Sequence, residues 1–430
     1  MGRTSDPSET WSDSERRVAQ WQRIAAHLPE LVERNPFYRA KLVAAGISDA
    51  REVRSIADLP FTTKAELSED QAAHPPFGTN LTYPLDRYVR LHQTSGTTGR
   101  PLRLLDTAES WQWWKDVWGL IYRGAGVTAA DRIFFCFSFG PFVGFWSAFA
   151  GAEQLGALCL TGGAMTTAER VATIQALDAT VLMCTPTYAL RLAEAARDEG
   201  VDLSRSSLRV SIHAGEPGAS IPATRDRIAQ AFGVRVVDHT GATEVGATGF
   251  SCEAEDGVHL IEREFVAEVR DLATGAVGEQ GEGELVLSNL GRWGMPVLRY
   301  RTGDRVTAVR GSCACGRTLV KLAGGITGRV DDMVTVRGVN VFPSAIEAIV
   351  RRFAEIEEYR VEVTRVREMD ELRCVVEPRA GAPAGLAERV ATAIRRDLGI
   401  RCAVEAVAPG TLPRFEMKAK RFSRREEART

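Results

Sequence analysis

Hydrophobic positions in the first half of the chain follow two alternating patterns. Residues 15–33 and 108–123 repeat apolar side chains at helical spacing. Between such helices lie short apolar runs, rich in β-branched or aromatic residues, that end in small or turn-forming residues. These runs cover residues 131–139, 180–186, 208–217 and 234–241. The alternation predicts an α/β fold with mostly parallel sheets, in which ligands bind beyond the carboxyl ends of the strands.

The pattern changes in the second half of the chain. Residues 281–290 and 295–309 alternate apolar and polar positions, as strands of a smaller β section do. After residues 328–332 the order becomes strand, helix, two strands, helix and strand, with helices expected at 343–353 and 385–398. A chain of 430 residues also exceeds the size at which a single core stops growing. We therefore predict a large N-terminal domain, residues 1–330, and a small α+β C-terminal domain, residues 331–430.

Charge and hydropathy exclude several classes of partner. Lys and Arg total 54 against 56 Asp and Glu, so the chain lacks the basic excess of a nucleic-acid-binding protein. Residues 1–17 are polar and contain no apolar segment of a secretory signal. Residues 133–152 are uncharged, but Gly140 and Pro141 interrupt them, which favours a buried strand, turn and helix over a membrane span. We expect a cytoplasmic protein that binds neither nucleic acid nor membrane.

A loop rich in glycine and hydroxyl groups, TSGTTGRP, covers residues 94–101. Glycine lets several backbone N–H groups point into one concavity, while Ser and Thr hydroxyls add donors and Arg100 adds positive charge. This combination suits phosphate. The loop lacks the Lys and Ser/Thr of a Walker A motif, however, and similar strings often form plain turns. Both interpretations stay open for the loop by itself.

Four further motifs follow this loop in order: DHTGATEVGATGF (238–250), YRTGD (300–304), GRVDDMVTVRGVNVFPSAIE (328–347) and LPRFEMKAKR (412–421). The five motifs together resemble those of the adenylate-forming superfamily of acyl-CoA synthetases and adenylation domains. Within it, the chain resembles the phenylacetate-CoA ligase family. That narrower resemblance rests on NPFYR (35–39), LPFTTKAEL (59–67), GAEQLGA (151–157), CTPTYALRLAE (184–194) and RGVNVFPSAIE (337–347).

The resemblance implies an enzyme that activates a carboxylic acid with ATP and Mg²⁺ through an acyl-adenylate. Transfer to the co-substrate CoA would follow, after the small domain, a mobile lid, rotates about a hinge near Asp331. The likeness also favours a homodimer. Two rival functions stay open. The enzyme could pass an aminoaryl or hydroxyaryl acid to a carrier-protein thiol or an amine, or the protein could bind an aryl acid or nucleotide without turnover.

The resemblance also implies roles for individual residues. Glu244 matches the carboxylate that holds Mg²⁺, a cation that prefers oxygen ligands, and Asp304 matches the residue that binds both ribose hydroxyls. The implied catalytic set is Lys418, Glu244 and Thr243. The implied ATP-binding set is Ser95, Gly96, Thr97, Thr98, Gly99, Gly215, Glu216, Pro217, Asp238, Thr240, Gly241, Asp304 and Arg329.

The chain departs from the family at two of these positions. The family usually carries Ser-x-Gly-Lys where this chain has Phe415, Glu416, Met417 and Lys418, so Lys420 is an alternative catalytic lysine. Thr240 stands where the family often has an aromatic residue that stacks on adenine. Thr cannot stack, so adenine is expected to contact residues 215–217 instead.

The acyl group is expected to lie between the Phe-rich segment and the string HAGEP, residues 213–217. A flat apolar pocket suits an aryl or arylalkyl acid. His213 could contact a ring amino or hydroxyl group of the substrate, although a single histidine is more often structural. The predicted pocket residues are Phe139, Pro141, Phe142, His213 and Ala214.

Three of the eight cysteines lie outside apolar strand or helix patterns. Cys313 and Cys315 form a close pair in a glycine-rich turn, and Cys252 precedes His259 by a short distance. Three thiolates and one imidazole make a set suited to structural Zn²⁺. The alternative is reduced free thiols, because disulfides are rare in the cytoplasm.

Overall fold

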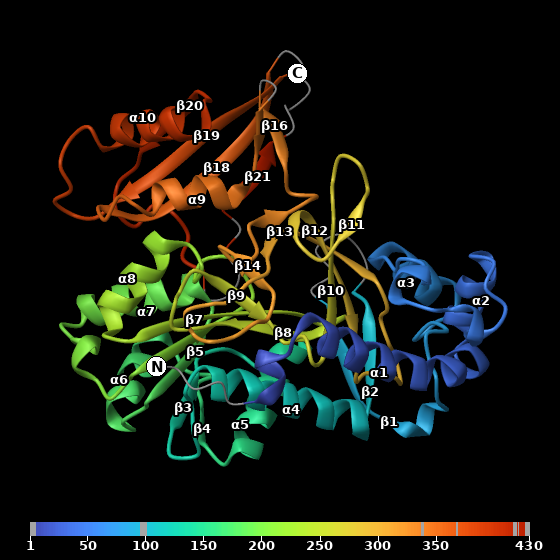
Figure 1. The fold of residues 1–430 in the computed structure, drawn as a ribbon. Helices are drawn as coiled ribbons and strands as arrows, with labels where there is room; N and C mark the ends of the chain where they lie inside the picture. The colour runs from blue at the N-terminus through green and yellow to red at the C-terminus, as the bar shows by residue number, and fades with distance from the viewer. Residues whose placement is uncertain are drawn as a thin grey trace.

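The computed structural model describes residues 6–94, 101–336, 339–366, 369–415, 419 and 421–425. Within these residues a 13-stranded sheet runs through the N-terminal part of the chain, and a separate four-stranded sheet belongs to the C-terminal part. Figure 1 shows the C-terminal sheet and its helices above the larger body. The predicted fold class, a large α/β part with a small α+β C-terminal domain, is confirmed.

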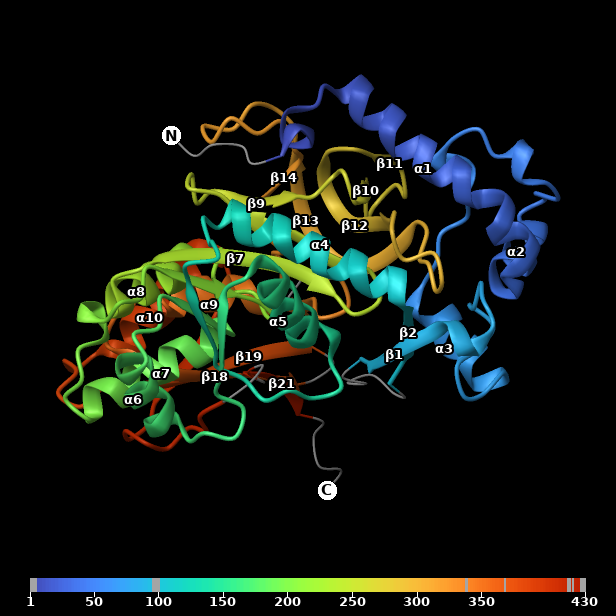
Figure 2. The same cartoon turned by 90° about the horizontal axis from the view of Figure 1, so that it is seen from below.

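One half of the large sheet is parallel, in the order β4-β3-β5-β6-β7. Its strands are β3 (Arg132–Phe135), β4 (Leu158–Thr161), β5 (Val181–Cys184), β6 (Val210–His213) and β7 (Arg235–Ala242). The helices around it are α4 (Ala108–Gly124), α5 (Val143–Leu155), α6 (Thr167–Ala176), α7 (Pro186–Asp198) and α8 (Pro222–Phe232). Figure 2 shows α4 crossing the sheet and α6, α7 and α8 beside its parallel half.

Both faces of the parallel strands are buried because side chains alternate along a strand. Phe134 and Leu182 pack with residues of α6, α7 and α8, whereas Ile133, Phe135 and Met183 pack with residues of α4 and α5. The uncharged segment 133–152 therefore forms β3, a turn and α5, although β3 is shorter than the predicted run. Within the described ranges, no helix is both long and apolar enough to cross a membrane.

The other half of the large sheet is antiparallel and continues directly from β7. It contains β8 (Gly246–Ser251), β9 (Gly257–Leu260), β10 (Phe265–Arg270), β11 (Val277–Gly278), β12 (Gly281–Asn289), β13 (Tyr300–Val309), β14 (Lys321–Ala323) and β15 (Gly328–Arg329). The predicted small β section is thus part of the same sheet as the parallel strands.

N-terminal helices cover part of the antiparallel section. Ile24, Leu28 and Leu31 of α1 (Asp13–Arg34) pack against Val266 and Leu298. The remaining elements of this part are α2 (Pro36–Ala44), α3 (Lys64–Ala73), the hairpin β1 (Tyr88–Gln93) and β2 (Arg103–Thr107), and the 3₁₀ helices Pro7–Thr10, Ala50–Glu52, Ile56–Asp58, Leu85–Arg87 and Leu203–Arg205.

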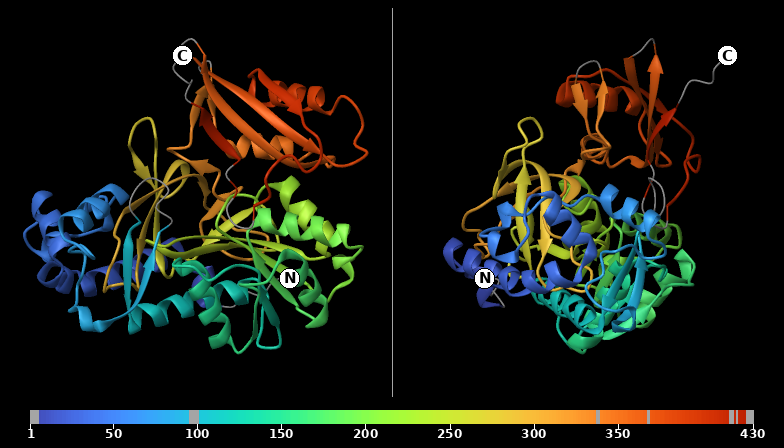
Figure 3. Two further views of the ribbon diagram at one scale, coloured as in Figure 1. Left: turned by 180° about the vertical axis from the view of Figure 1, so that it is seen from behind. Right: turned by 90° about the vertical axis from the view of Figure 1, so that its right-hand side faces the viewer.

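The C-terminal part has a hydrophobic core of its own. Its strands are β16 (Val334–Val336), β17 (Val339–Val341), β18 (Ile356–Val366), β19 (Met369–Pro378), β20 (Cys402–Ala406) and β21 (Phe422–Arg425), and its helices are α9 (Pro343–Val350) and α10 (Leu386–Leu398). The predicted helix 343–353 therefore ends at Val350. Gly385 and Gly399 flank α10 with φ of +77° and +69°, a conformation open mainly to glycine, and so fix both of its ends. Figure 3 shows this part on one side of the large body in both views.

Candidate active site and metal cluster

The loops that follow β5, β6 and β7 lie at one edge of the parallel sheet. Cys184 and His213, the last residues of β5 and β6, are register partners, and His213 is also the register partner of Asp238 within β7. The residues that come next, including Glu216 and Glu244, must therefore leave the sheet on the same side. This is the edge at which ligands bind in open parallel sheets.

Glu244 lies in a nearly closed environment, with a side chain that is 8% exposed. Its Oε1 is 3.2 Å from Nζ of Lys64, and the Tyr300 side chain lies close enough to the carboxylate to interact with it. Burial raises the pKa of Tyr300 well above its usual value, so Tyr300 is a neutral donor. Glu244, Lys64 and Tyr300 thus bring three of the sequence motifs together.

Local backbone contacts place Lys64 beside Glu244. Thr62 donates its N–H to the carbonyl of Arg299 at 3.0 Å, and its own carbonyl accepts from the N–H of Arg301 at 2.8 Å. Thr63 then caps α3, so Lys64 is the first helical residue. Sequence reasoning missed Lys64, although the residue lies within the motif LPFTTKAEL. The signal that could have found it is a lysine that follows two threonines and precedes an acidic residue in the first turn of a helix.

A buried ion pair fixes the backbone on which Glu244 lies. Arg292 contacts both carboxylate oxygens of Asp106, at 2.6 and 2.8 Å, and both side chains are fully buried. The same guanidinium donates to the carbonyls of Thr243 and Glu244, at 2.7 and 3.2 Å. Burial alone would raise the pKa of Asp106, but Arg292 and His92 lower it below its ordinary value. Neither member of the pair lies in a recognised motif, so the sequence offered no signal for it.

The predicted ribose site joins β13 to β15. Asp304 and Arg329 are register partners, and Nη1 of Arg329 lies 3.1 Å from Oδ1 of Asp304 and 2.6 Å from the carbonyl of Thr302. Burial raises the pKa of Asp304 despite the opposing effect of Arg329. Asp331, the predicted hinge, also pairs with Arg329, at 3.1 Å.

The predicted adenine region contains two buried polar side chains. Burial raises the pKa of Asp238 to about 7, and Ser220 donates a short hydrogen bond to its carboxylate. Oγ1 of Thr240 lies 3.0 Å from that of Thr248 and is buried with it. Thr240 is therefore engaged with the neighbouring strand.

The predicted acyl region is rich in aromatic contacts. Phe139 is half-buried, with ring centroids 4.7 Å from Trp146 and 5.5 Å from Phe149. The carbonyl of Pro141 accepts from the N–H of Gln93 at 2.8 Å, so this loop lies beside the end of β1. Phe142 and Ala214 are half-buried and Pro141 is exposed.

His213 is fully buried with both ring nitrogens in contact with protein atoms. Nε2 lies 2.9 Å from Oγ of Ser211, and Nδ1 lies 3.2 Å from the carbonyl of Cys184. Burial lowers the pKa of His213 to about 4, so the ring is neutral at pH 7. These partners favour the structural role over contact with a substrate.

Two predicted segments lie outside the described residues. Ser95, Gly96, Thr97, Thr98 and Gly99 of the phosphate loop are among them, as are Lys418 and Lys420. The two residues that flank this loop, Thr94 and Leu102, are joined to each other by two hydrogen bonds of 3.0 Å. Their predicted roles stay predictions.

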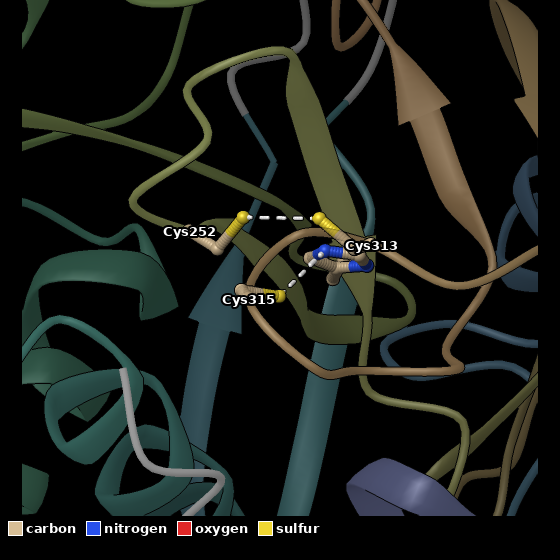
Figure 4. Close-up of side chains that lie close together, drawn as sticks. Cys252, Cys313 and Cys315 are labelled. Carbon is tan, nitrogen blue, oxygen red and sulfur yellow. Dashed lines mark hydrogen bonds between the residues drawn. The ribbon is translucent and has the colours of Figure 1, made fainter. Parts of the chain in front are cut away.

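Cys252, His259, Cys313 and Cys315 come together as the sequence predicts (Figure 4). Their four ligand atoms lie within 4.8 Å of one another, with Sγ of Cys252 and Cys313 3.7 Å apart and Sγ of Cys315 3.6 Å from Nε2 of His259. A tetrahedral Zn²⁺ with Zn–S bonds of about 2.3 Å requires sulfur atoms about 3.8 Å apart. Nδ1 of His259 lies 3.3 Å from the carbonyl of Leu319, which directs the Nε2 lone pair toward the sulfur atoms.

Comparisons with known proteins agree with this geometry. Residues 33–291 match the AMP-binding enzyme family, and residues 338–425 match the AMP-binding enzyme C-terminal domain. The chain is 33% identical over 429 residues to phenylacetate-coenzyme A ligase of Escherichia coli (strain K12), covering 96% of each chain. It is 32% identical to the enzyme of the same name from Thermus thermophilus, covering 95% of this chain and 96% of the relative.

Among solved structures, 2-hydroxyisobutyryl-CoA ligase in its postadenylation state superposes with a TM-score of 0.91 at 31% identity, covering 98% of this chain and 93% of the other. The same protein in its thioesterification state gives a TM-score of 0.73 at 33% identity, covering 98% and 92%. The chain belongs to the AMP-binding enzyme family, as the sequence motifs predict. The narrower resemblance to phenylacetate-CoA ligases is confirmed, and so is the predicted class, an AMP-forming acid–thiol ligase.

Replacing Arg292 by Met should destabilise the large domain by about 3–5 kcal/mol, because Asp106 would keep a buried and unpaired charge. Chemical denaturation of the purified protein measures this loss. Arg87→Met is the matched control, since Arg87 pairs with Glu109 and both side chains are largely exposed, so stability should change by less than about 1 kcal/mol. Equal losses of stability in the two variants would contradict the role proposed for the Arg292–Asp106 ion pair.

Asp238 should make the protein less stable as pH rises from about 4 to about 7. Its folded-state pKa lies above the unfolded value, so between these limits the folded state retains a proton that the unfolded state releases. Asp238→Asn should therefore raise the melting temperature relative to wild type, and the gain should grow from pH 5 to pH 7.5. Asp198→Asn, at an exposed position of α7, is the control. A gain that does not depend on pH would refute this assignment.

Proposed function

We propose that the protein is a ligase that activates an aryl or arylalkyl carboxylic acid with ATP and Mg²⁺ and transfers the acyl group to CoA. The observation that carries the proposal is that Glu244 and the aromatic loop after β3 both follow parallel strands at one edge of the sheet, and that Asp304, paired with Arg329, lies near enough to Glu244 for their charges to interact. Family membership supports the adenylation step, and the named relatives support CoA as the acceptor.

Glu244 fits the role of a Mg²⁺ ligand. Its carboxylate is nearly buried and is accompanied by the cation of Lys64 and the hydroxyl of Tyr300. Bound Mg²⁺ would neutralise charge on the phosphates of ATP. Lys64 would add a second positive charge beside those phosphates, while Asp304 would accept hydrogen bonds from the ribose hydroxyls.

An aryl acid fits the aromatic side chains of the loop after β3 and of α5 better than a small aliphatic acid does. Phe139, Trp146 and Phe149 present ring edges and faces within contact distance of one another, and a substrate ring could extend this set. The relatives named as phenylacetate-coenzyme A ligases favour the same class. The solved relative that acts on a 2-hydroxyisobutyryl group makes a branched hydroxy acid the main competitor.

Transfer to CoA requires a second position of the C-terminal domain. The chain superposes more closely on the postadenylation form of its relative than on the thioesterification form, so the C-terminal domain here lies in an orientation like the former. We propose that rotation near Asp331 brings residues 336–343 toward the site for thioester formation. A carrier-protein thiol or an amine as acceptor remains the second candidate.

We also propose that Cys252, His259, Cys313 and Cys315 hold a structural Zn²⁺. Sulfur spacing and the orientation of His259 fit a closed tetrahedral site without an open position for catalysis. The ion would join the loop of Cys313 to the strands that follow Glu244. Because Arg317 and Thr318 of that loop also contact the N-terminal 3₁₀ turn and the residue that follows it, the site would stabilise three segments at once.

The decisive experiment is product analysis by mass spectrometry with ATP and a mixed panel of aryl and branched hydroxy acids, with and without CoA. Without CoA, we expect acyl-adenylate as the only acyl product. With CoA, we expect aryl-CoA.

Lys418→Ala should lower adenylation by about 10²- to 10³-fold, as loss of a preorganised donor does, while thioester formation from supplied acyl-adenylate continues. Lys420→Ala is the matched control. Normal adenylation by Lys418→Ala together with loss in Lys420→Ala would reverse the assignment.

Elemental analysis of protein purified without added metal should give about one zinc per chain. Cys313→Ser combined with Cys315→Ser should abolish the metal and lower the melting temperature, with a secondary loss of activity. Cys159→Ser, which changes a half-buried thiol away from the cluster, should keep the zinc. Metal-free protein with unchanged stability and activity would exclude a structural role.

A further inference from the structure

His239 is a buried histidine of β7, and the contact made by one of its ring nitrogens fixes where the ring proton lies. Nδ1 is 2.8 Å from the carbonyl of Gly249 in the neighbouring strand β8. Because a carbonyl oxygen only accepts hydrogen bonds, Nδ1 carries the proton and donates. The residue is 7% exposed, and burial lowers the pKa of His239 to about 4. The ring is therefore neutral at pH 7 and keeps a lone pair on Nε2.

The lone pair on Nε2 has no hydrogen-bond donor among the residues that the structure describes. Its neighbour on the chain side is Gly241, near the carboxyl end of β7. A β-carbon at this glycine would lie 3.4 Å from Nε2. Gly241 is exposed, so Nε2 lies beside an accessible surface at the end of the strand that leads to Glu244. The unused acceptor is thus at the edge of the sheet where the candidate site lies.

The imidazole ring of His239 also borders the aromatic side chains of the predicted acyl region. Its centroid is 4.5 Å from the ring centroid of Trp118 in α4. Nε1 of Trp118 donates to Oγ of Ser147 in α5 at 2.9 Å, so Trp118 joins His239 to this helix. The same helix carries Trp146 and Phe149, whose rings contact the loop after β3. A hydrogen-bond acceptor is therefore placed next to a surface that is otherwise aromatic.

We infer that His239 is a specificity-determining residue of the acyl site: its Nε2 accepts a hydrogen bond from a hydroxyl or amino group on the ring of the substrate. The inference rests on the proposed function and deepens it, because it narrows the aryl acids to those that carry such a donor. An unsubstituted ring would cover Nε2 without supplying a hydrogen, and a buried acceptor left without a partner is unfavourable. A donating ring substituent removes that penalty.

The sequence suggested this kind of recognition at a different histidine. Both ring nitrogens of His213 are in contact with protein atoms, so neither is left for a substrate. In His239 only Nδ1 is engaged, and the other nitrogen is an acceptor without a partner in the described part of the chain. Contact with a ring hydroxyl or amino group is therefore a role for His239 and not for His213.

The kinetic test compares hydroxyaryl and aminoaryl acids with methyl-substituted acids of similar shape, using the full chain. Wild type should adenylate the donor-bearing acids with kcat/KM about 10- to 100-fold above that of the methyl analogues. His239→Leu should abolish this preference, because leucine has no acceptor. His239→Gln should keep part of it, since its amide oxygen can accept. His74→Leu, at an exposed histidine after α3, is the matched control and should keep the full preference.

NMR of protein labelled with ¹⁵N-histidine provides a readout that does not require turnover or the leucine variant to fold. With a non-hydrolysable ATP analogue present, a hydroxyaryl acid should move the Nε2 resonance of His239, and the methyl analogue should not. If wild type adenylates no acid but the resonance moves in this way, recognition by His239 stands and the proposed function fails. An Nε2 resonance that no donor-bearing acid moves, or a preference that persists in folded His239→Leu, would overturn the inference.

Discussion

The ion pair between Arg292 and Asp106 is the constraint on which the candidate active site depends. Two fully buried opposite charges are stable only when they are paired and hydrogen-bonded on all sides, and Arg292 meets this need by also binding the carbonyls of Thr243 and Glu244. The same contacts that compensate a buried charge therefore fix the backbone of the predicted Mg²⁺ ligand. Because a guanidinium is planar and rigid, it holds the backbone after β7 at a fixed position relative to β2.

The contacts between the two domains are of a different kind. Arg414 pairs with Glu194 of the large domain at 2.8 Å and with Glu377 of the C-terminal domain at 2.6 Å, and Arg197 pairs with Glu357 at 3.0 Å. The hydrophobic core of each domain is separate. Polar contacts over separate cores can be exchanged for water at low cost, so they oppose the proposed rotation less than a shared hydrophobic core would.

Sequence motifs identified much of the candidate site but none of the residues that hold it in place. Glu244 lies in a motif that continues past the end of β7, whereas Asp304 and Arg329 lie within β13 and β15, where the structure brings them into direct contact. Lys64, Arg292 and Asp106 were missed. Their contacts join residues far apart in the chain, and nothing in the local sequence around Arg292 or Asp106 distinguishes them from surface charges. Glu216, which the sequence places at ATP, has its observed partners on α7 and the C-terminal segment.

The sequence by itself determined the fold class, the two-part organisation, the family and the four residues of the Cys/His cluster. These follow from hydrophobic periodicity and from residue types at fixed spacing, which are local properties that backbone geometry converts directly into elements. Only the tertiary structure decided which charges pair, that the parallel and antiparallel strands form one sheet, and that His213 is engaged by its neighbours on both ring nitrogens. Such outcomes depend on the desolvation of particular side chains by distant segments, and desolvation is set by packing in three dimensions.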